Sequence, residues 1–417
     1  MRNIFDQFAQ PENRLTHALA SVLALSPTLC RRFVRWAVNF PVPADERRLH
    51  VEQQRVPGTP EPVDEGEPSS RPDACIYGDG NWCVVIESKV GADLGVKQLE
   101  RHRRMAKRAF DDVHVLAITA EEKPADLPTD ICHRTWVEVF EWLGDNATVA
   151  PSWVDRLREY MRLLESRLLA EGYGMGKSSI TTFDGIRFGA NHPYSHREAK
   201  LLLRQLMELL RRRKRLLALG ASLEEDGRPR ITGKEGSGVW DVISLRPRER
   251  KGKGDFTSWP HLTIFINATL TRVVVTVPNN VATAYRKRLS RKRDDFVTIA
   301  RRVEREVTRH VAARDGFQPV LILSQRHFRG RQVQIEDGRL NFDLRTIRGN
   351  RRHHIKRQPH WIALAFDLFA DKRGANVQLQ IGADFLHEGG YLSTVEAPER
   401  IEAVWLACKP ILDAMPV

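Results

Sequence analysis

Residues 72–89 read PDACIYGDGNWCVVIESK, and this stretch determines the fold that we expect for the first part of the chain. Two short apolar runs, 73–77 and 82–87, lie on either side of the turn GDGN at 78–81. A Gly- and Asn-containing turn between two such runs predicts a β-hairpin. The second run is almost entirely apolar, which is typical of a strand buried in the middle of a sheet.

Three polar side chains are expected to meet at one end of this hairpin. Glu87 and Lys89 are two positions apart, so on a strand they point to the same face. The partner strand of the hairpin opens at Asp73 and can bring that carboxylate beside them. The sequence therefore predicts two carboxylates and one amine held together at the end of a sheet.

This set of groups suits Mg²⁺, or Mn²⁺, acting on a phosphodiester. Mg²⁺ binds through one or two carboxylates together with water and phosphate oxygens. Such an ion can activate water and neutralise charge that builds on a phosphate. Asp73 and Glu87 are the candidate ligands, and the Ser88 carbonyl is a third. Lys89 would orient or deprotonate the attacking water, or offset charge in the transition state.

The segments around the hairpin predict a mixed α/β domain. The expected order is helix, helix, two strands, helix, strand and two helices, which gives a central mixed sheet flanked by helices. A loop rich in Pro, Gly and acidic residues precedes the hairpin at 56–72. The helices are expected at 12–25, 27–39, 93–110, 135–143 and 152–170, and the additional strand at 113–119.

The hairpin resembles the core of the PD-(D/E)xK nuclease superfamily, which contains restriction endonucleases, repair nucleases and resolvases. Pro72 and Asp73 match the PD element, and the residues 87–89 match the ExK element after its apolar strand. Many members carry a Glu on the first helix and a Gln on the helix after ExK. Glu12 and Gln98 stand at these two places here.

The resemblance covers roughly residues 1–171 and implies a restriction-endonuclease-like fold for them. It also implies a metal-dependent endonuclease, with DNA as the first substrate to consider. Glu12 and Gln98 then join the catalytic set, and Glu12 joins the metal ligands. His102, one turn after Gln98, is expected at the rim of the site.

Alternatives to this function remain open at the level of sequence. One is a nuclease that cleaves RNA or repairs particular DNA structures. Another, from a different class, is a catalytically silent DNA-binding or scaffold protein whose working part is the basic C-terminal half. A purely structural interpretation of the hairpin also remains, in which Glu87 and Lys89 are solvated strand-end charges and Asp73 is a turn residue. A role in bacterial restriction or anti-phage defence, with a homodimer or a defence-system partner, is an analogy with other nucleases of this kind.

The second half of the chain differs sharply in charge. Residues 1–180 hold 23 Lys and Arg against 27 Asp and Glu, a net charge of −4, whereas 181–417 hold 43 against 26, a net charge of +17. A strongly basic half suits a polyanion such as nucleic acid. We therefore expect a linker at 172–185 and a basic α+β domain at 186–417 that binds nucleic acid or senses a target.

The pattern within this basic half indicates helices and strands but no motif that identifies a fold. Helices are expected at 195–219, 281–289, 294–313 and 397–414, and strands at 261–267, 272–277, 319–324, 331–336, 340–345, 361–367 and 377–381.

Length and composition set the remaining expectations. A chain of 417 residues suggests two domains. Its five cysteines include no CxxC pair, which predicts reduced and mostly buried thiols. The sequence shows neither an apolar run long enough for a membrane helix nor a signal-peptide pattern, so we expect a cytoplasmic protein without a membrane partner.

Overall fold

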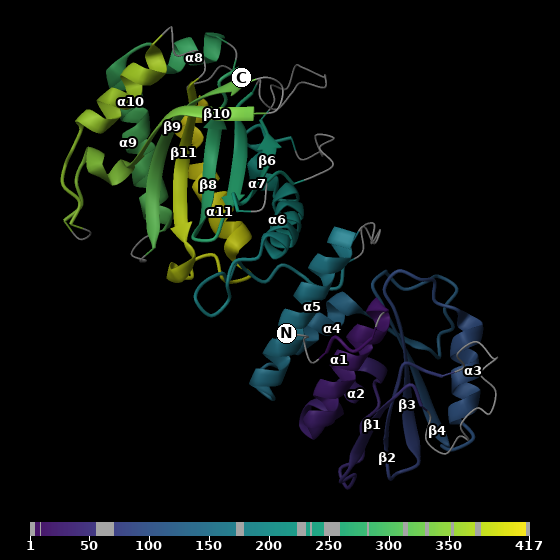
Figure 1. The fold of residues 1–417 in the computed structure, drawn as a ribbon. Coiled ribbons are helices and arrows are strands. Elements are labelled where there is room, and N and C mark those ends of the chain that lie inside the picture. The colour runs from purple at the N-terminus through teal and green to yellow at the C-terminus, as the bar shows by residue number, and fades with distance from the viewer. Residues whose placement is uncertain are drawn as a thin grey trace. The chain divides into compact units, whose positions relative to one another are not determined.

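The computed structural model describes residues 5–8, 10–55, 71–171, 179–222, 231–233, 236–245, 259–281, 283–311, 316–329, 333–351, 354–371 and 377–413. The chain divides into two compact units, Met1–Thr182 and Phe183–Val417 (Figure 1). The division falls within the stretch predicted as a linker, of which 172–178 lie outside the described residues.

The first unit is built on a five-stranded mixed sheet with the order β1-β2-β3-β4-β5. The β1, β2 and β3 strands pair antiparallel, whereas β3, β4 and β5 pair parallel. The predicted hairpin and the strand after it are present, but β1 and β5 were not expected. The strands are Leu49–Gln53 (β1), Ala74–Gly78 (β2), Trp82–Lys89 (β3), Asp112–Thr119 (β4) and Cys132–Thr135 (β5).

Helices cover both faces of this sheet (Figure 1). One face packs, through residues such as Ile76, Val84 and Ile118, against four helices in a single buried cluster. On the other face Cys75 and Val85 pack against Ala106 at the end of α3. The expectation of a mixed sheet flanked by helices is thus confirmed. The helices are Pro11–Leu25 (α1), Pro27–Val38 (α2), Val96–Ala106 (α3), Trp136–Asp145 (α4) and Pro151–Glu171 (α5).

Glu46 holds the turn of the β2–β3 hairpin. Its carboxylate accepts the backbone N–H groups of Asp79 at 2.9 Å and Gly80 at 3.0 Å, and the indole N–H of Trp82 at 3.1 Å. Burial raises the pKa of Glu46, but these three donors outweigh burial and leave the pKa below its ordinary value. Gly78 makes room for this arrangement, because a Cβ there would lie 2.4 Å from the Glu46 carboxyl group.

Replacing Glu46 by alanine is expected to lower the free energy of unfolding by about 1–3 kcal/mol, because it leaves the buried Trp82 indole without its acceptor. Glu141→Ala, at an exposed glutamate of α4, is the matched control. Since the pKa of Glu46 is lowered by folding, the difference should be present above its ordinary pKa and shrink as the pH falls below it. Urea unfolding at neutral and acidic pH measures both effects, and equal losses for the two variants would contradict this role.

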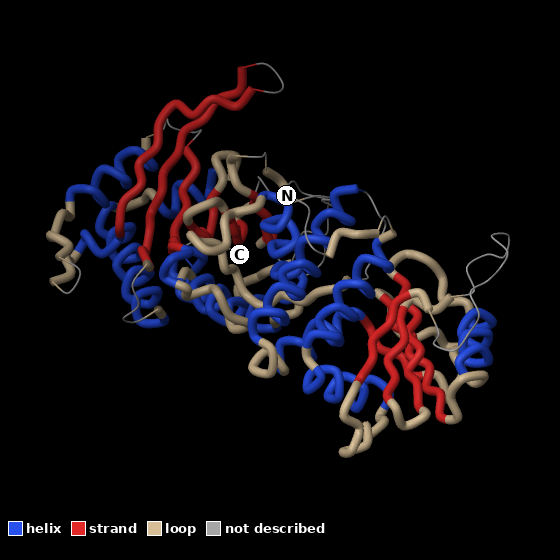
Figure 2. Tube along the Cα trace, turned by 60° about the horizontal axis from the view of Figure 1, so that its bottom comes forward, coloured by secondary structure: helices blue, strands red, loops and turns tan. Residues whose placement is uncertain are grey.

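The second unit is built on a six-stranded sheet with the order β10-β9-β11-β8-β7-β6. Every pair of neighbours in it is antiparallel. The long β9–β10 hairpin extends past the other strands (Figure 2). The strands are Val239–Ser244 (β6), His261–Ile266 (β7), Leu270–Val277 (β8), Phe317–Arg329 (β9), Val333–Asp343 (β10) and Val377–Leu386 (β11).

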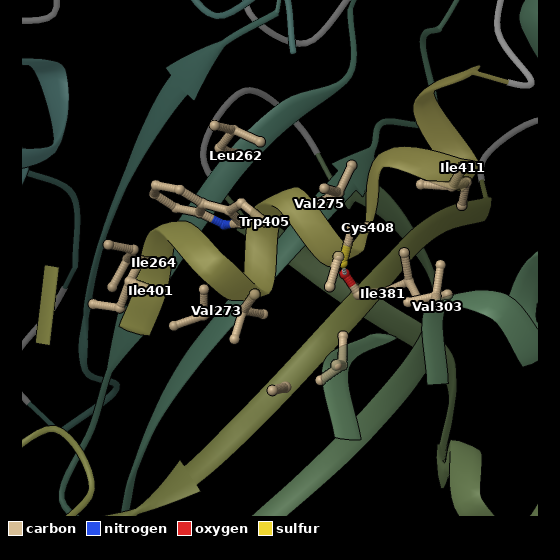
Figure 3. Close-up of a cluster of buried hydrophobic side chains, with 14 of the residues drawn as sticks. Leu262, Ile264, Val273, Val275, Val303, Ile381, Ile401, Trp405, Cys408 and Ile411 are labelled. Atoms are coloured by element: carbon tan, nitrogen blue, oxygen red, sulfur yellow. Dashed lines mark hydrogen bonds between the residues drawn. The ribbon is translucent and has the colours of Figure 1, made fainter. Parts of the chain in front are cut away.

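One face of this second sheet packs against helices. Figure 3 shows Trp405 of α11, and Cys408 directly after this helix, lying over Val273, Val275 and Ile381 of β8 and β11. The Trp405 indole also donates to the carbonyl of Val274 at 3.2 Å. The unit is therefore an α+β arrangement with its core between this face and the helices. The helices are His196–Arg211 (α6), Lys214–Leu217 (α7), Thr283–Leu289 (α8), Arg293–His310 (α9), His360–Ala370 (α10), Ala397–Ala407 (α11) and Lys409–Asp413 (α12).

Several element predictions in this unit were wrong. The helix expected at 195–219 is two helices, α6 and α7, and the described part of the helix expected at 397–414 is α11 followed by α12. The segment 361–367 is part of helix α10, because Ile362, Ala365 and Phe369 recur at helical spacing and bury one stripe. The two strands expected at 331–336 and 340–345 are, where described, the single strand β10, which has an irregularity between residues 336 and 338. Residues 331–332 lie outside the described residues, and 344–345 open a 3-10 helix, Leu344–Ile347. The strand β6 was not expected.

The prediction of reduced and mostly buried thiols is confirmed, because all five cysteines are free and four of them are buried. No helix in the described ranges is both long and apolar enough to cross a membrane.

Candidate active site

The carboxyl end of β3 and the residue before β2 form one cluster. Ala74 pairs with Ile86, so Asp73 lies opposite the next residue of β3, Glu87. The Asp73 Oδ2 atom accepts the backbone N–H of Ser88 at 2.7 Å. The amine of Lys89 donates to Glu87 Oε1, also at 2.7 Å. The structure thus brings the two carboxylates and the amine together as the hairpin pattern predicted.

The two residues suggested by the resemblance, Glu12 and Gln98, lie on helices that pack on opposite faces of the sheet. Gln98 on α3 donates its side-chain N–H to Glu87 Oε1 at 2.7 Å. Glu12 lies in the first turn of α1 and acts through its charge, which contributes to raising the pKa values of Asp73 and Lys89. Gln98 therefore contacts the cluster directly, whereas Glu12 influences it electrostatically.

His102 is a member of the site that sequence reasoning placed wrongly. Its side chain is fully buried, with 0% exposure, and its Nε2 lies 3.2 Å from Glu87 Oε2. The rim position was wrong because α3 is strongly basic along its length, which suggested an exposed helix. The spacing of four residues from Gln98 was the available signal, since it places both side chains on one face of α3.

Glu87 is the most constrained member of the cluster. One of its oxygens accepts from Lys89 and Gln98, and the other faces His102. Burial raises the pKa of Glu87, but His102 and Lys89 outweigh burial and hold the pKa below the ordinary value for a glutamate. The side chain is therefore an ionised carboxylate that hydrogen bonds from Lys89 and Gln98 fix in place, with the His102 ring beside its other oxygen.

Asp73 behaves in the opposite way. Burial, and then the negative charge of Glu87, raise its pKa to about 7, although the Ser88 N–H and Lys89 act to lower it. Burial lowers the pKa of Lys89, but Glu87 and Asp73 raise it above its ordinary value, so this amine is positively charged at neutral pH. The site thus holds two different carboxylates. The negative charge of Glu87 is balanced by positive and donor groups, whereas the negative charge of Asp73 is buried and repelled by that of Glu87.

A cation bound between Asp73 and Glu87 would offset the repulsion between their negative charges. Within the described ranges, no group of three or more His, Cys, Asp and Glu side chains is arranged to hold a metal. Mg²⁺ does not require such a group, because it keeps several waters and binds through one or two carboxylates. Asp73 and Glu87 fit this role chemically, and the Ser88 carbonyl and Glu12 stay predictions as ligands.

Comparison with known proteins adds no assignment. No protein-family model matches the chain, and no curated protein matches it.

Proposed function

We propose that Met1–Thr182 is a metal-dependent endonuclease unit that hydrolyses phosphodiester bonds, with DNA as its substrate. The observation that carries this proposal is the cluster of Asp73, Glu87 and Lys89 at the end of the mixed sheet. Gln98 and His102 also lie against Glu87 in this cluster. A buried charge with several close partners fits a reaction centre better than a solvated strand end, where charges are exposed and have few partners.

Asp73 and Glu87 would hold the divalent ion, with Ser88 and Glu12 as further candidates. When bound, the ion would activate water and neutralise charge on the phosphate. A carboxylate whose pKa is raised by burial and by a like charge gains most from such an ion, because the ion offsets the lost hydration and the repulsion from Glu87.

Lys89 would act as a positive charge beside the scissile phosphate. Its raised pKa keeps the amine protonated at neutral pH, which disfavours the role of a general base. The charged amine suits two other tasks, orienting the attacking water and offsetting the negative charge of the transition state. Glu87 holds the amine through the 2.7 Å hydrogen bond, so the position of Lys89 is set before substrate binds.

A cleavage assay with the full chain tests this function. Plasmid, linear duplex, single-stranded DNA and RNA are incubated with Mg²⁺, with Mn²⁺ and with EDTA. We expect cleavage of DNA with either metal and none with EDTA. Cleavage of RNA alone would replace DNA as the substrate, and cleavage that is unaffected by EDTA, or no cleavage of any substrate, would contradict a metal-dependent nuclease.

Replacing His102 by alanine is expected to lower the cleavage rate by about 10–100-fold, the usual cost of losing a group that orients a metal ligand. The reason is that Glu87 Oε2 loses its one close partner on α3. His102→Gln should restore part of the rate, because its amide can donate to the same oxygen. The cleavage rate as a function of Mg²⁺ concentration is the measurement, and an unchanged metal requirement in His102→Ala would contradict this positioning role.

A further inference from the structure

The sheet of the second unit has an apolar face, which packs against helices, and an opposite face that carries polar side chains. A cavity of about 530 Å³ lies on the polar face. One end of this cavity is formed by the neighbouring strands β11, β9 and β10, which contribute Gln378, Arg326, Glu336 and Arg339. The two arginines make this end a candidate site for an anion.

Strand pairing places these side chains around one further residue, Ser324 of β9. Ser324 is the cross-strand partner of Gln378 on one side and of Arg339 on the other. Arg326 lies two residues farther along β9, and its partner is Glu336. Cross-strand partners share one face of a sheet, and so do residues two apart on one strand. The five side chains therefore lie together on the polar face.

The register irregularity in β10 brings both of its charged residues to this face. Ser324 and Arg326 are two residues apart on β9, whereas their partners Arg339 and Glu336 are three residues apart on β10. In a regular strand, residues three apart point to opposite faces, so the extra residue is what turns Arg339 toward Glu336. Irregularities of this kind often re-aim a side chain beside a functional site.

The positive charge at this end of the cavity is incompletely compensated. Arg339 donates to Glu336 Oε2 at 2.9 Å, whereas the Nε of Arg326 lies 3.9 Å from the same oxygen, beyond hydrogen-bonding distance. Burial lowers the pKa of Arg326 and outweighs the opposite influence of Glu336. Two guanidinium groups and one carboxylate leave one positive charge, which matches an anion with a single negative charge.

The Ser324 hydroxyl is the observation that points to a bound group. Ser324 is 2% exposed, and its Oγ has no hydrogen-bond partner among the residues that the structure describes. Buried polar groups nearly always have a partner, and an unpaired one indicates a bound water, ion or ligand. An oxygen of an anion held by Arg326 and Arg339 would give this hydroxyl an acceptor.

Arg272, also in the cavity wall, shows the contrasting case of a cation that is fully compensated. Its guanidinium makes two hydrogen bonds to the carboxylate of Asp384, both at 2.7 Å. This pair needs no further partner, so it is not expected to attract an anion. The expected anion site is therefore the end of the cavity formed by β9, β10 and β11.

We propose that the Ser324 hydroxyl, the Gln378 amide and the guanidinium groups of Arg326 and Arg339 bind a phosphodiester group. A phosphodiester carries one negative charge, and its two unesterified oxygens can each accept more than one hydrogen bond. Guanidinium, hydroxyl and amide groups are its usual partners in proteins. A doubly charged phosphate monoester would exceed the local positive charge.

A nucleic-acid strand and a free dinucleotide share this phosphodiester chemistry. The inference stands on residues of Phe183–Val417 alone. It does not depend on the nuclease activity proposed for the other unit, and its test is made without the metal that this activity needs.

Phosphorus NMR titration of the full chain in EDTA tests this ligand. The titrants are TpT, which has one phosphodiester and no other phosphate, a longer oligothymidylate without terminal phosphates, and inorganic phosphate. We expect the diesters to bind more tightly than inorganic phosphate. Tighter binding of the longer strand would indicate a nucleic-acid strand, and equal binding of TpT a free dinucleotide. Absence of binding by both diesters, or equally tight binding of inorganic phosphate, would overturn the proposal.

Ser324→Ala is the most specific variant, because it removes the unpaired hydroxyl and little else. It should weaken phosphodiester binding about fivefold or more, as expected for loss of a hydrogen bond to a charged group. Without ligand, its free energy of unfolding in urea should not fall, since no hydrogen bond to a described residue is lost. Wild-type affinity, or a loss of stability without ligand, would overturn the role of Ser324 in binding.

Arginine variants test the charged part of the site. Arg326→Gln should weaken phosphodiester binding about tenfold or more, and Arg326→Lys should retain more of the affinity. Arg309→Gln removes an exposed arginine of α9 that pairs with Glu306, and it should leave affinity unchanged. An equal loss in Arg309→Gln would show that net charge alone attracts the ligand and would overturn the site.

Discussion

Replacing Lys89 by alanine is expected to lower the cleavage rate by about 10²–10⁴-fold, the range for removal of a group that acts only in the transition state. The amine lies 2.7 Å from Glu87 and is positively charged, so its loss removes positive charge from the place where the phosphate becomes more negative. The matched control is Lys107→Ala, at an exposed lysine that follows α3. This control should cleave at nearly the wild-type rate.

The same Lys89→Ala variant should bind nucleic acid almost as tightly as the wild-type chain. Affinity for a polyanion is the sum of many contacts from Lys and Arg to phosphates, so one amine supplies a small share of it. Binding is measured with Ca²⁺ in place of Mg²⁺, which is intended to leave the substrate intact. If the folded variant loses binding together with cleavage, Lys89 docks the substrate and has no specific role in the chemical step.

Asp73→Asn is expected to stop cleavage and, in EDTA, to stabilise the fold. Cleavage stops because the variant loses a charged metal ligand. The fold gains stability because the buried charge of Asp73 lies beside Glu87 and is unfavourable without a metal. Asparagine keeps an oxygen that can accept the Ser88 N–H, so the backbone contact is preserved. We expect the free energy of unfolding in EDTA at pH 8 to rise by about 1 kcal/mol or more, since one pKa unit corresponds to about 1.4 kcal/mol.

The gain from Asp73→Asn should depend on pH in a defined direction. Folding raises the pKa of Asp73 from 3.8 to about 7, so its stabilising contribution is complete below pH 4 and is lost as the pH rises through 7. The advantage of the variant over the wild-type chain should therefore be large at pH 8 and small at pH 5. Urea unfolding at both pH values measures this advantage, and an advantage that grows toward pH 5 would contradict an unfavourable charge on buried Asp73.

The structure of the first unit was largely accessible from sequence because local patterns there agree with the fold. The GDGN turn and the apolar run before Glu87 define the β2–β3 hairpin without help from distant segments. The alternation of side chains along a strand then puts Glu87 and Lys89 on one face, so their contact could be predicted from their spacing alone. The positions of Glu12 and Gln98 came from the resemblance and not from local pattern.

The features that sequence did not predict depend on contacts between distant residues. Glu46 caps a hairpin turn more than thirty residues later in the chain, and no local signal marks such a partner. His102 is buried because Glu87 lies beside it in space, although its neighbours along the helix are basic. The strand β6 forms because β7 offers it an edge, which composition alone does not reveal.

The segment 361–367 was wrongly predicted as a strand for a different reason. Its apolar residues fit both a buried strand and the buried stripe of a helix, and short apolar runs cannot be assigned by periodicity alone. The structure resolves the ambiguity in favour of α10, whose Phe369 packs against Phe296 of α9.

The most direct test of the proposed active site is a time course of DNA cleavage in Mg²⁺ by the wild-type chain and by Lys89→Ala, purified identically. Identical purification controls for any contaminating nuclease. We predict steady cleavage by the wild-type chain, which EDTA abolishes, and a rate at least about 10²-fold lower for the variant. Equal rates for the two proteins would contradict the assignment of Asp73, Glu87 and Lys89 as the active site.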